Sequence, residues 1–225
     1  MPNYGVDAAP GQAGAFGSYA FNAKGHEIDQ LFFKGLIGAF TLDQIVNNYI
    51  DSAYLESYKE DNTNDVISGS SNPYTTMEHK WDEAFGYLYG AEEDPQNNIP
   101  VLGVDDFLNK YLAKVEGDPS FAGIAGDIYD AFKLGREAIV RKNYTLLDEQ
   151  VSILREKISL IIAVRSVYYL QAGKTYIAEN NPAKAFHNLS EGYGFIFSLQ
   201  YVKFISPKLL QIKDIIKNSS SCCCK

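Results

Sequence analysis

Two stretches of this chain share one pattern: His79-Lys80-Trp81-Asp82-Glu83-Ala84-Phe85-Gly86-Tyr87-Leu88-Tyr89 and His187-Asn188-Leu189-Ser190-Glu191-Gly192-Tyr193-Gly194-Phe195-Ile196-Phe197. Both read H-x-x-x-E-[AG]-[FY]-G-[FY]-[LI]-[FY], and every position is displaced by 187 − 79 = 108 residues without a gap. The pattern takes in two of the three histidines. We interpret it as an internal duplication, which predicts a protein built from two related halves.

Each copy of the pattern fits an α-helix with a defined start. Thr75 can cap the first copy, and Glu78, three residues later, can complete a capping box. Asn181 can cap the second copy, and Pro182 suits the first helical position. The sequence therefore predicts helices over about 75–90 and 182–201.

The two faces of each predicted helix differ in character. At about 100° per residue, the apolar side chains of each copy, Trp81 among them, share one face, which is typical of a core stripe. The opposite face carries a histidine, a glutamate and a glycine at matched positions: His79, Glu83 and Gly86 in the first copy, and His187, Glu191 and Gly194 in the second. Because a glycine inside a helix costs about 1 kcal/mol relative to alanine, these two glycines indicate close approach of another backbone or a ligand.

Composition limits the class of protein. The 225 residues are 46% hydrophobic, which is enough for a folded core. The formal net charge is −8 and no cluster of Lys and Arg stands out, so we expect no nucleic-acid partner. We also expect no signal peptide in this chain and no transmembrane span. The cysteines, Cys222 to Cys224, are adjacent and cannot build a disulfide framework across a fold.

Helical periodicity organises the rest of the chain. We expect coil over 1–24, a single helical domain over 25–217 with pseudo-repeats of about 25–90 and 120–201, and a disordered tail over 218–225. No strand pattern competes. The predicted fold is all-α, a bundle of about seven helices built from two duplicated halves. The predicted helices are about 28–49 (one long helix, or two broken near Thr41), 75–90, 105–115, 121–141, 145–177, 182–201 and 206–217.

The stretch Tyr74-Thr75-Thr76-Met77-Glu78-His79-Lys80-Trp81-Asp82-Glu83-Ala84-Phe85-Gly86-Tyr87 resembles the uncharacterised bacterial cell-envelope lipoproteins that share domain of unknown function 4856. The stretch from His187 to Tyr201 is similar to that family's ending. The resemblance implies a place in the cell envelope, facing the periplasm, and implies that the chain corresponds to the C-terminal half to two-thirds of a member. A looser similarity to the imelysin-like proteins, which are duplicated helical bundles linked to iron uptake, is an analogy for the fold.

The duplicated His/Glu pairs permit two interpretations. Residues four apart on a helix are neighbours, so each histidine can pair with its own glutamate. If the two motif helices face each other, His79, Glu83, His187 and Glu191 converge and could bind iron, zinc or manganese. Alternatively, each glutamate fixes the tautomer of its histidine, and the pair locks helix packing as a buried polar network. Arg165, in an apolar run, needs a partner such as Glu83 or Glu191.

These observations lead to two functional hypotheses. We find no nucleophile elbow, phosphate-binding loop or His-Glu-x-x-His motif, so an enzyme is the less favoured class. The first hypothesis is an envelope-associated helical binding protein that handles a metal ion or metal complex through the four His and Glu ligands. Trp81, Gly86, Gly194 and Arg165 would support that site. The second is a structural or interaction module, with an envelope protein as partner, in which the motif only locks helix packing.

Overall fold

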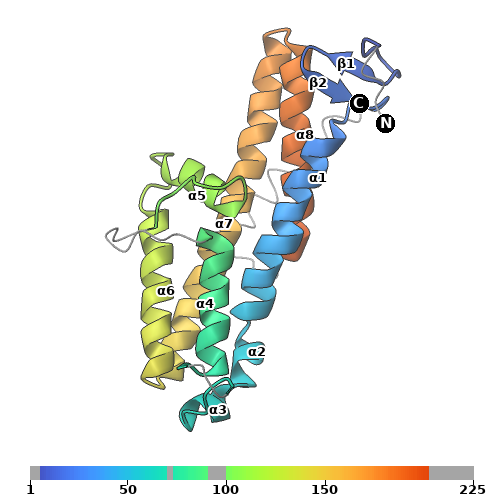
Figure 1. The fold of residues 1–225 in the computed structure, drawn as a ribbon. Helices are drawn as coiled ribbons and strands as arrows, with labels where there is room; N and C mark the ends of the chain where they lie inside the picture. The colour runs from blue at the N-terminus through green and yellow to red at the C-terminus, as the bar shows by residue number, and fades with distance from the viewer. Residues whose placement is uncertain (1–5, 70–72, 91–99, 203–225) are drawn as a thin grey trace. The chain divides into compact units, whose positions relative to one another are not determined.

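The computed structural model describes residues 6–69, 73–90 and 100–202. Within these ranges it contains eight α-helices and one two-stranded β-sheet (Figure 1), which confirms the predicted all-α class. The described residues fall into two compact units, and the single helical domain over 25–217 stays a prediction. Unit 1 holds 6–38 and 162–200, and unit 2 holds the described part of 39–161 together with 201–202. The two copies of the motif therefore belong to different units.

Unit 1 begins with a short β-hairpin, where the sequence predicted coil. Strands β1 (Gly14–Phe16) and β2 (Tyr19–Phe21) are antiparallel, with Phe16 opposite Tyr19. Gly17, at the two-residue turn, has a φ of 62°, a conformation that glycine adopts without strain. Each strand has only three residues, which is too short for the alternation that identifies a strand in a sequence.

Three helices complete unit 1: α1 (Ile28–Leu36), the end of α7 (Tyr144–Ala178) and α8 (Pro182–Ser198). Asn181 caps α8 as predicted, because its side chain accepts a hydrogen bond from the Lys184 amide at 3.2 Å. Helices α1 and α8 lie side by side and run in the same direction (Figure 1). The turn η3 (Leu199–Tyr201) follows α8 and ends the helix predicted for 182–201.

Unit 2 begins where the first predicted helix, 28–49, continues past α1. It passes through the π-helical turns η1 (Ile37–Leu42) and η2 (Ile45–Tyr49), so the helix is locally widened near Thr41, where one of the two predicted alternatives placed a break. Two short helices follow, α2 (Ser52–Glu56) and α3 (Lys59–Thr63), and both lie outside the predicted helices. The remaining helices are α4 (Thr76–Tyr89), α5 (Leu108–Glu116), α6 (Ile124–Val140) and the first part of α7.

Helix α4 starts with the capping box predicted from the sequence. The Thr75 hydroxyl accepts from the Glu78 amide at 3.3 Å, and the Thr75 amide donates to the Glu78 carboxylate at 2.6 Å. Along the described part of the chain, no helix combines the length and apolar character needed to cross a membrane. The predicted helix over 206–217, the predicted tail over 218–225 and the three cysteines lie outside the described residues.

Candidate functional site

In unit 1, the second copy of the motif forms a charged network between α8 and α1. His187 Nδ1 lies 2.6 Å from an oxygen of Glu27, the N-cap residue of α1. His187 Nε2 lies 3.4 Å from one oxygen of Glu191, and the other oxygen of Glu191 lies 3.2 Å from Lys34 Nζ. Glu27 and Glu191 are both buried. This network joins two helices that are far apart in the sequence.

The carboxylates favour the charged form of His187. The hydrogen bond to Glu27 raises the pKa of His187, and the negative charges of Glu191 and Glu27 act in the same direction. Burial of the ring and the positive charge of Lys34 oppose this rise in pKa. With His187 protonated, two positive side chains face two negative ones, so the network is neutral overall. Neutrality makes its burial tolerable.

The glycine of this copy lets the two helix backbones approach closely. A Cβ atom on Gly194 would lie 2.6 Å from Lys34 Cβ and 2.8 Å from the Leu31 carbonyl oxygen. Hydrogen bonds reinforce the contact at both ends: the Glu27 amide donates to Ser190 Oγ at 2.9 Å, and Ser198 Oγ donates to the Lys34 carbonyl at 2.6 Å. The backbone approach predicted for Gly194 is therefore the approach of α1.

In unit 2, the first copy of the motif leaves the same face open. His79 Nε2 lies 3.3 Å from Glu83, whose second oxygen accepts from Lys80 Nζ at 2.8 Å within the same helix. The His79 ring stacks on Tyr74 at 5.1 Å between centroids. The His79 side chain is 41% exposed, against 22% for His187. A Cβ atom on Gly86 would meet no described atom within 4 Å.

The core faces of the two motif helices, by contrast, match. The Trp81 indole packs on Gly135 of α6, where a Cβ atom would overlap the ring, and Trp81 Nε1 donates to the Phe132 carbonyl at 2.8 Å. Leu189, which is Trp81's counterpart at 81 + 108, packs on Gly173 of α7, where a Cβ atom would lie 2.7 Å from the leucine side chain. The two motif helices thus pack in the same way on their inner, core-facing sides and differ in the contacts of their outer faces.

Among the described residues of unit 1, Arg165 forms no ion pair with Glu191, one of the two carboxylates that the sequence suggested. The residue is 5% exposed, and its guanidinium lies 3.9 Å from the centre of the Tyr168 ring and 4.6 Å from that of Tyr169. Its Nε has no hydrogen-bond partner among the described atoms. Glu191, one of the two suggested partners, instead binds His187 and Lys34. Cation–π contacts therefore take the place of the expected ion pair.

The described residues contain no group of three or more His, Cys, Asp or Glu side chains that could hold a metal ion. Within unit 1, His187 and Glu191 already have protein partners at both ends of the imidazole and on both carboxylate oxygens. Their geometry matches the second interpretation, a buried polar network that locks helix packing. The iron or zinc site formed from both copies stays a prediction.

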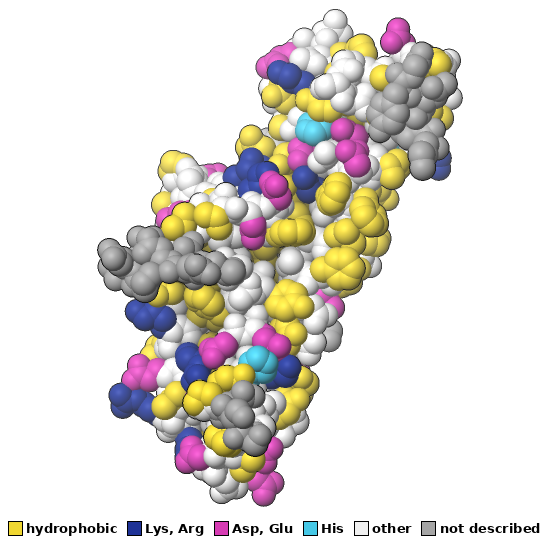
Figure 2. All heavy atoms as spheres, in the orientation of Figure 1, with side chains coloured by type: hydrophobic (Ala, Val, Ile, Leu, Met, Phe, Trp, Pro, Cys, Tyr) yellow, Lys and Arg dark blue, Asp and Glu magenta, His cyan; other side chains and the backbone are white. Residues whose placement is uncertain are grey.

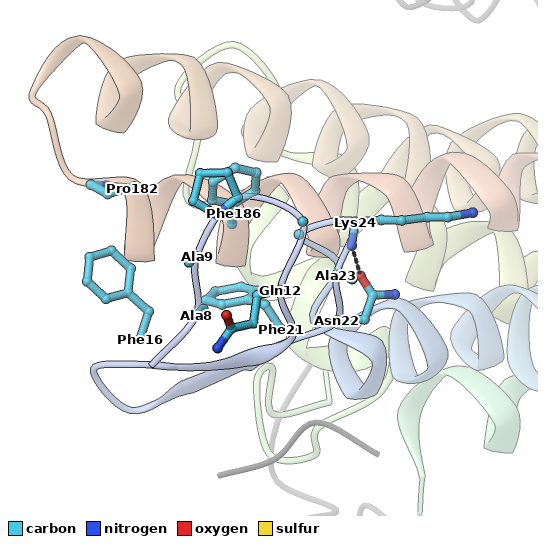
Figure 3. Close-up of a pocket in the computed structure, with 13 residues that line it drawn as sticks. Ala8, Ala9, Gln12, Phe16, Phe21, Asn22, Ala23, Lys24, Pro182 and Phe186 are labelled. Carbon is cyan, nitrogen blue, oxygen red and sulfur yellow. Dashed lines mark hydrogen bonds between the residues drawn. The ribbon is translucent and has the colours of Figure 1, made fainter. Parts of the chain in front are cut away.

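Unit 1 also contains a cavity of about 500 Å³ between the hairpin segment and the start of α8 (Figure 3). We call it the hairpin cavity. Phe16 and Phe21 line it from the hairpin, and Pro182 and Phe186 line it from α8. The side-chain amide of Gln12 also reaches the wall. A largely apolar pocket of this volume with a few polar groups is typical of small-molecule sites.

The second copy of the motif holds the wall of this cavity in place. The Tyr19 ring of β2 stacks on His187 with centroids 4.4 Å apart, and Phe21 packs near Phe186 at 6.0 Å. Gly25 has a φ of 80°, and a Cβ atom there would lie 2.8 Å from the Phe186 ring. The His187 network therefore ties the hairpin to α8. The cavity was not predicted from the sequence. The aromatic and proline residues within 1–24 were the signal that could have indicated it.

A second surface feature of unit 1 is aromatic. Figure 2 shows hydrophobic side chains gathered over α1. Phe32 and Phe33 are 60% and 56% exposed, and their rings meet edge to face at 6.1 Å. Helix α1 thus presents a charged and small-residue face to α8 and an aromatic face to solvent.

The fold and site define a helical protein with a duplicated packing motif and an apolar cavity. The chain belongs to the family described as domain of unknown function DUF4856, whose family model matches residues 1–213. This match confirms the resemblance carried by Tyr74 to Tyr87. No curated protein and no solved structure matches the chain, and the similarity to imelysin-like proteins has no support.

Proposed function

We propose that the protein is a helical binding module that takes an uncharged, largely apolar small molecule in the hairpin cavity. The observation that carries the proposal is the cavity itself, with about 500 Å³ of space and three phenyl rings in its wall: Phe16, Phe21 and Phe186. Phenyl rings bind flat or alicyclic groups by burying apolar area and by stacking. We therefore expect a ligand with a ring or a short alkyl chain.

The polar groups of the cavity restrict the ligand further. Gln12 and Asn22 contribute neutral amides, whereas the side chain of Lys24, which also lines the cavity, extends away from the phenyl rings (Figure 3). The side-chain oxygen of Asn22, Oδ1, is already used, because it accepts from the backbone amides of Lys24 and His26 at 2.9 Å each. The wall therefore offers an apolar ligand only a few hydrogen bonds, which favours a molecule with one or two neutral polar groups.

The duplicated motif has a supporting role in this proposal. His187 lies next to Phe186 in α8, and its stack on Tyr19 fixes the hairpin against the helix. A preformed cavity avoids part of the entropy cost of ordering its wall when the ligand binds. The envelope location is part of the same proposal and rests on the family resemblance alone.

Titration with N-phenyl-1-naphthylamine, a neutral aromatic probe whose fluorescence rises in apolar surroundings, tests the proposal. We expect saturable binding by the wild type. Ala9→Leu, which adds a side chain at the cavity wall, and Phe186→Ala, which removes a ring, should each weaken binding by about tenfold, or about 1.4 kcal/mol.

The matched control is Ala178→Leu, an exposed alanine of α7 that does not line the cavity. Its affinity for the probe should equal that of the wild type. Equal binding by all four proteins, or no saturable binding by the wild type, would overturn the proposal. Circular dichroism of each variant confirms that the fold is retained.

A further inference from the structure

The two copies of the motif provide an internal comparison. On α8, the outer face of the motif (His187, Glu191, Gly194) is covered by α1 of the same chain. Helix α1 meets it with a carboxylate, Glu27, on the histidine and an ammonium, Lys34, on the glutamate. The two α1 residues are seven apart, which places them on one side of a helix over a length of about 10 Å.

On α4, the corresponding outer face (His79, Glu83, Gly86) has no such cover among the described residues. We call these three residues the α4 outer face. Glu83 and Gly86, with Tyr87, line a shallow hollow on the surface of unit 2. The same three residue types at the same spacing thus form a filled interface in one unit and an open surface in the other.

The contacts of Gly86 within the described residues do not explain why a glycine lies at this position inside α4. Glycine is the least favourable residue inside a helix after proline. At Gly194 the absence of a side chain has a structural purpose, because α1 occupies the space that a Cβ atom would fill. At Gly86 no described atom uses that space. A helix packed on α4 as α1 packs on α8 would give Gly86 the same purpose.

Charge and apolar surface on α4 also fit such a helix. Lys80 forms an ion pair with Glu83 within α4, and this pair corresponds to the ion pair of Lys34 with Glu191. In the second copy, the position of Lys80 is occupied by Asn188. Each motif glutamate therefore pairs with one lysine, Glu83 with Lys80 of its own helix and Glu191 with Lys34 of α1. A surface ion pair of this kind is worth little, so an incoming lysine can exchange with Lys80 readily. Beside the hollow, the rings of Tyr49 and Tyr87 pack 5.3 Å apart and offer apolar contact area.

We propose that the α4 outer face docks a helix of a partner protein that has the chemistry of α1. That helix carries a carboxylate near its N-terminal end, for His79, and a lysine seven residues later, for Glu83. Between them its backbone passes over Gly86. A second copy of this chain is not the occupant, because its own α1 is held in the buried network with His187 and Glu191. This surface is separate from the hairpin cavity, so the inference goes beyond the proposed function.

The probe for the test is a fluorescently labelled peptide of residues 25–38 (GHEIDQLFFKGLIG), which contains Glu27 and Lys34. It is titrated with the full chain and followed by fluorescence anisotropy. A free peptide of this length is marginally helical, so we expect a dissociation constant on the order of 100 μM. Gly86→Ala and Gly86→Leu should weaken binding by at least about tenfold, because a side chain then occupies the path of the peptide backbone.

A charge exchange gives the sharper result. Glu83→Lys in the protein should weaken binding, and a Lys34→Glu peptide should bind the Glu83→Lys protein better than it binds the wild type. Glu149→Lys, an equal charge change at an exposed position of α7, serves as the control and should bind like the wild type. Absence of binding to the wild type at about 1 mM peptide would overturn the proposal. Binding that is insensitive to Gly86 and Glu83 would overturn it as well, because the peptide would then occupy another surface.

Discussion

Replacing Gly86 by alanine should stabilise the protein, whereas the same replacement at Gly194 should give no gain in stability or a loss. Gly86 and Gly194 occupy the same position of the duplicated pattern, and both lie inside a helix. In each variant the gain in helix propensity is the same, about 1 kcal/mol. At Gly86 the new methyl group meets no described atom within 4 Å, so Gly86→Ala should keep the whole gain.

At Gly194 the methyl group would lie 2.6 Å from Lys34 Cβ and 2.8 Å from the Leu31 carbonyl oxygen. Real Cβ atoms do not approach that closely, so the α1 backbone must move. Overpacking of this kind costs about 1–3 kcal/mol. The difference between the two variants isolates that cost, because the propensity gain cancels.

For a chain of this size, 1 kcal/mol corresponds to about 2–4 °C in melting temperature. Gly86→Ala should therefore melt about 2–4 °C above the wild type, and Gly194→Ala should melt below Gly86→Ala by about 2–12 °C. Thermal unfolding followed by circular dichroism measures both values. Fluorescence of Trp81, the only tryptophan, follows unit 2 separately. Equal melting temperatures, or a lower one for Gly86→Ala, would refute the assignment of the two faces.

Three further substitutions test the packing of the units. The raised pKa of His187 means that its charged network contributes full stability below the unfolded pKa of about 6.5 and loses it as the pH rises through the folded pKa. The difference in melting temperature between the wild type and His187→Gln should accordingly be largest near pH 5.5 and smallest near pH 9, two values that bracket this transition. A difference that does not depend on pH would contradict the role of Glu27. Trp81→Phe loses the 2.8 Å hydrogen bond to the Phe132 carbonyl and leaves space beside Gly135, so urea unfolding should show a loss of about 2 kcal/mol or more. Asn62→Ala removes the buried amide that donates to the Ile139 carbonyl at 3.0 Å and accepts from Thr75 Oγ1 at 2.6 Å, and the same assay should show a loss of about 1–3 kcal/mol; an unchanged midpoint would show that these groups find other partners.

Much of the fold follows from local sequence. Helical periodicity predicted α4, α6, α7 and α8, since each repeats apolar residues over several turns. The Thr75 and Asn181 caps were also predicted, because capping uses neighbours within three residues. The hairpin was missed because its strands are too short to establish a period, and α3 was missed because its five residues are polar.

The site depends on contacts that no local pattern encodes. Glu27 meets His187 across 160 residues of sequence, and Phe16 and Phe21 share a cavity with Phe186 only after the hairpin packs on α8. The duplicated motif predicted the same chemistry for both copies. The copies differ because α1 covers one outer face, and that depends on the partner helix rather than on the motif.

The central claim is that the second His/Glu pair holds two helices together. Isothermal titration calorimetry with Zn(II), and anaerobically with Fe(II), tests it most directly on the wild type, His79→Ala and His187→Ala. The account predicts no stoichiometric metal binding by the wild type, and a larger drop in melting temperature for His187→Ala than for His79→Ala, because only His187 bridges to another helix. Stoichiometric binding that either single substitution abolishes would contradict the account and establish the duplicated pairs as metal ligands.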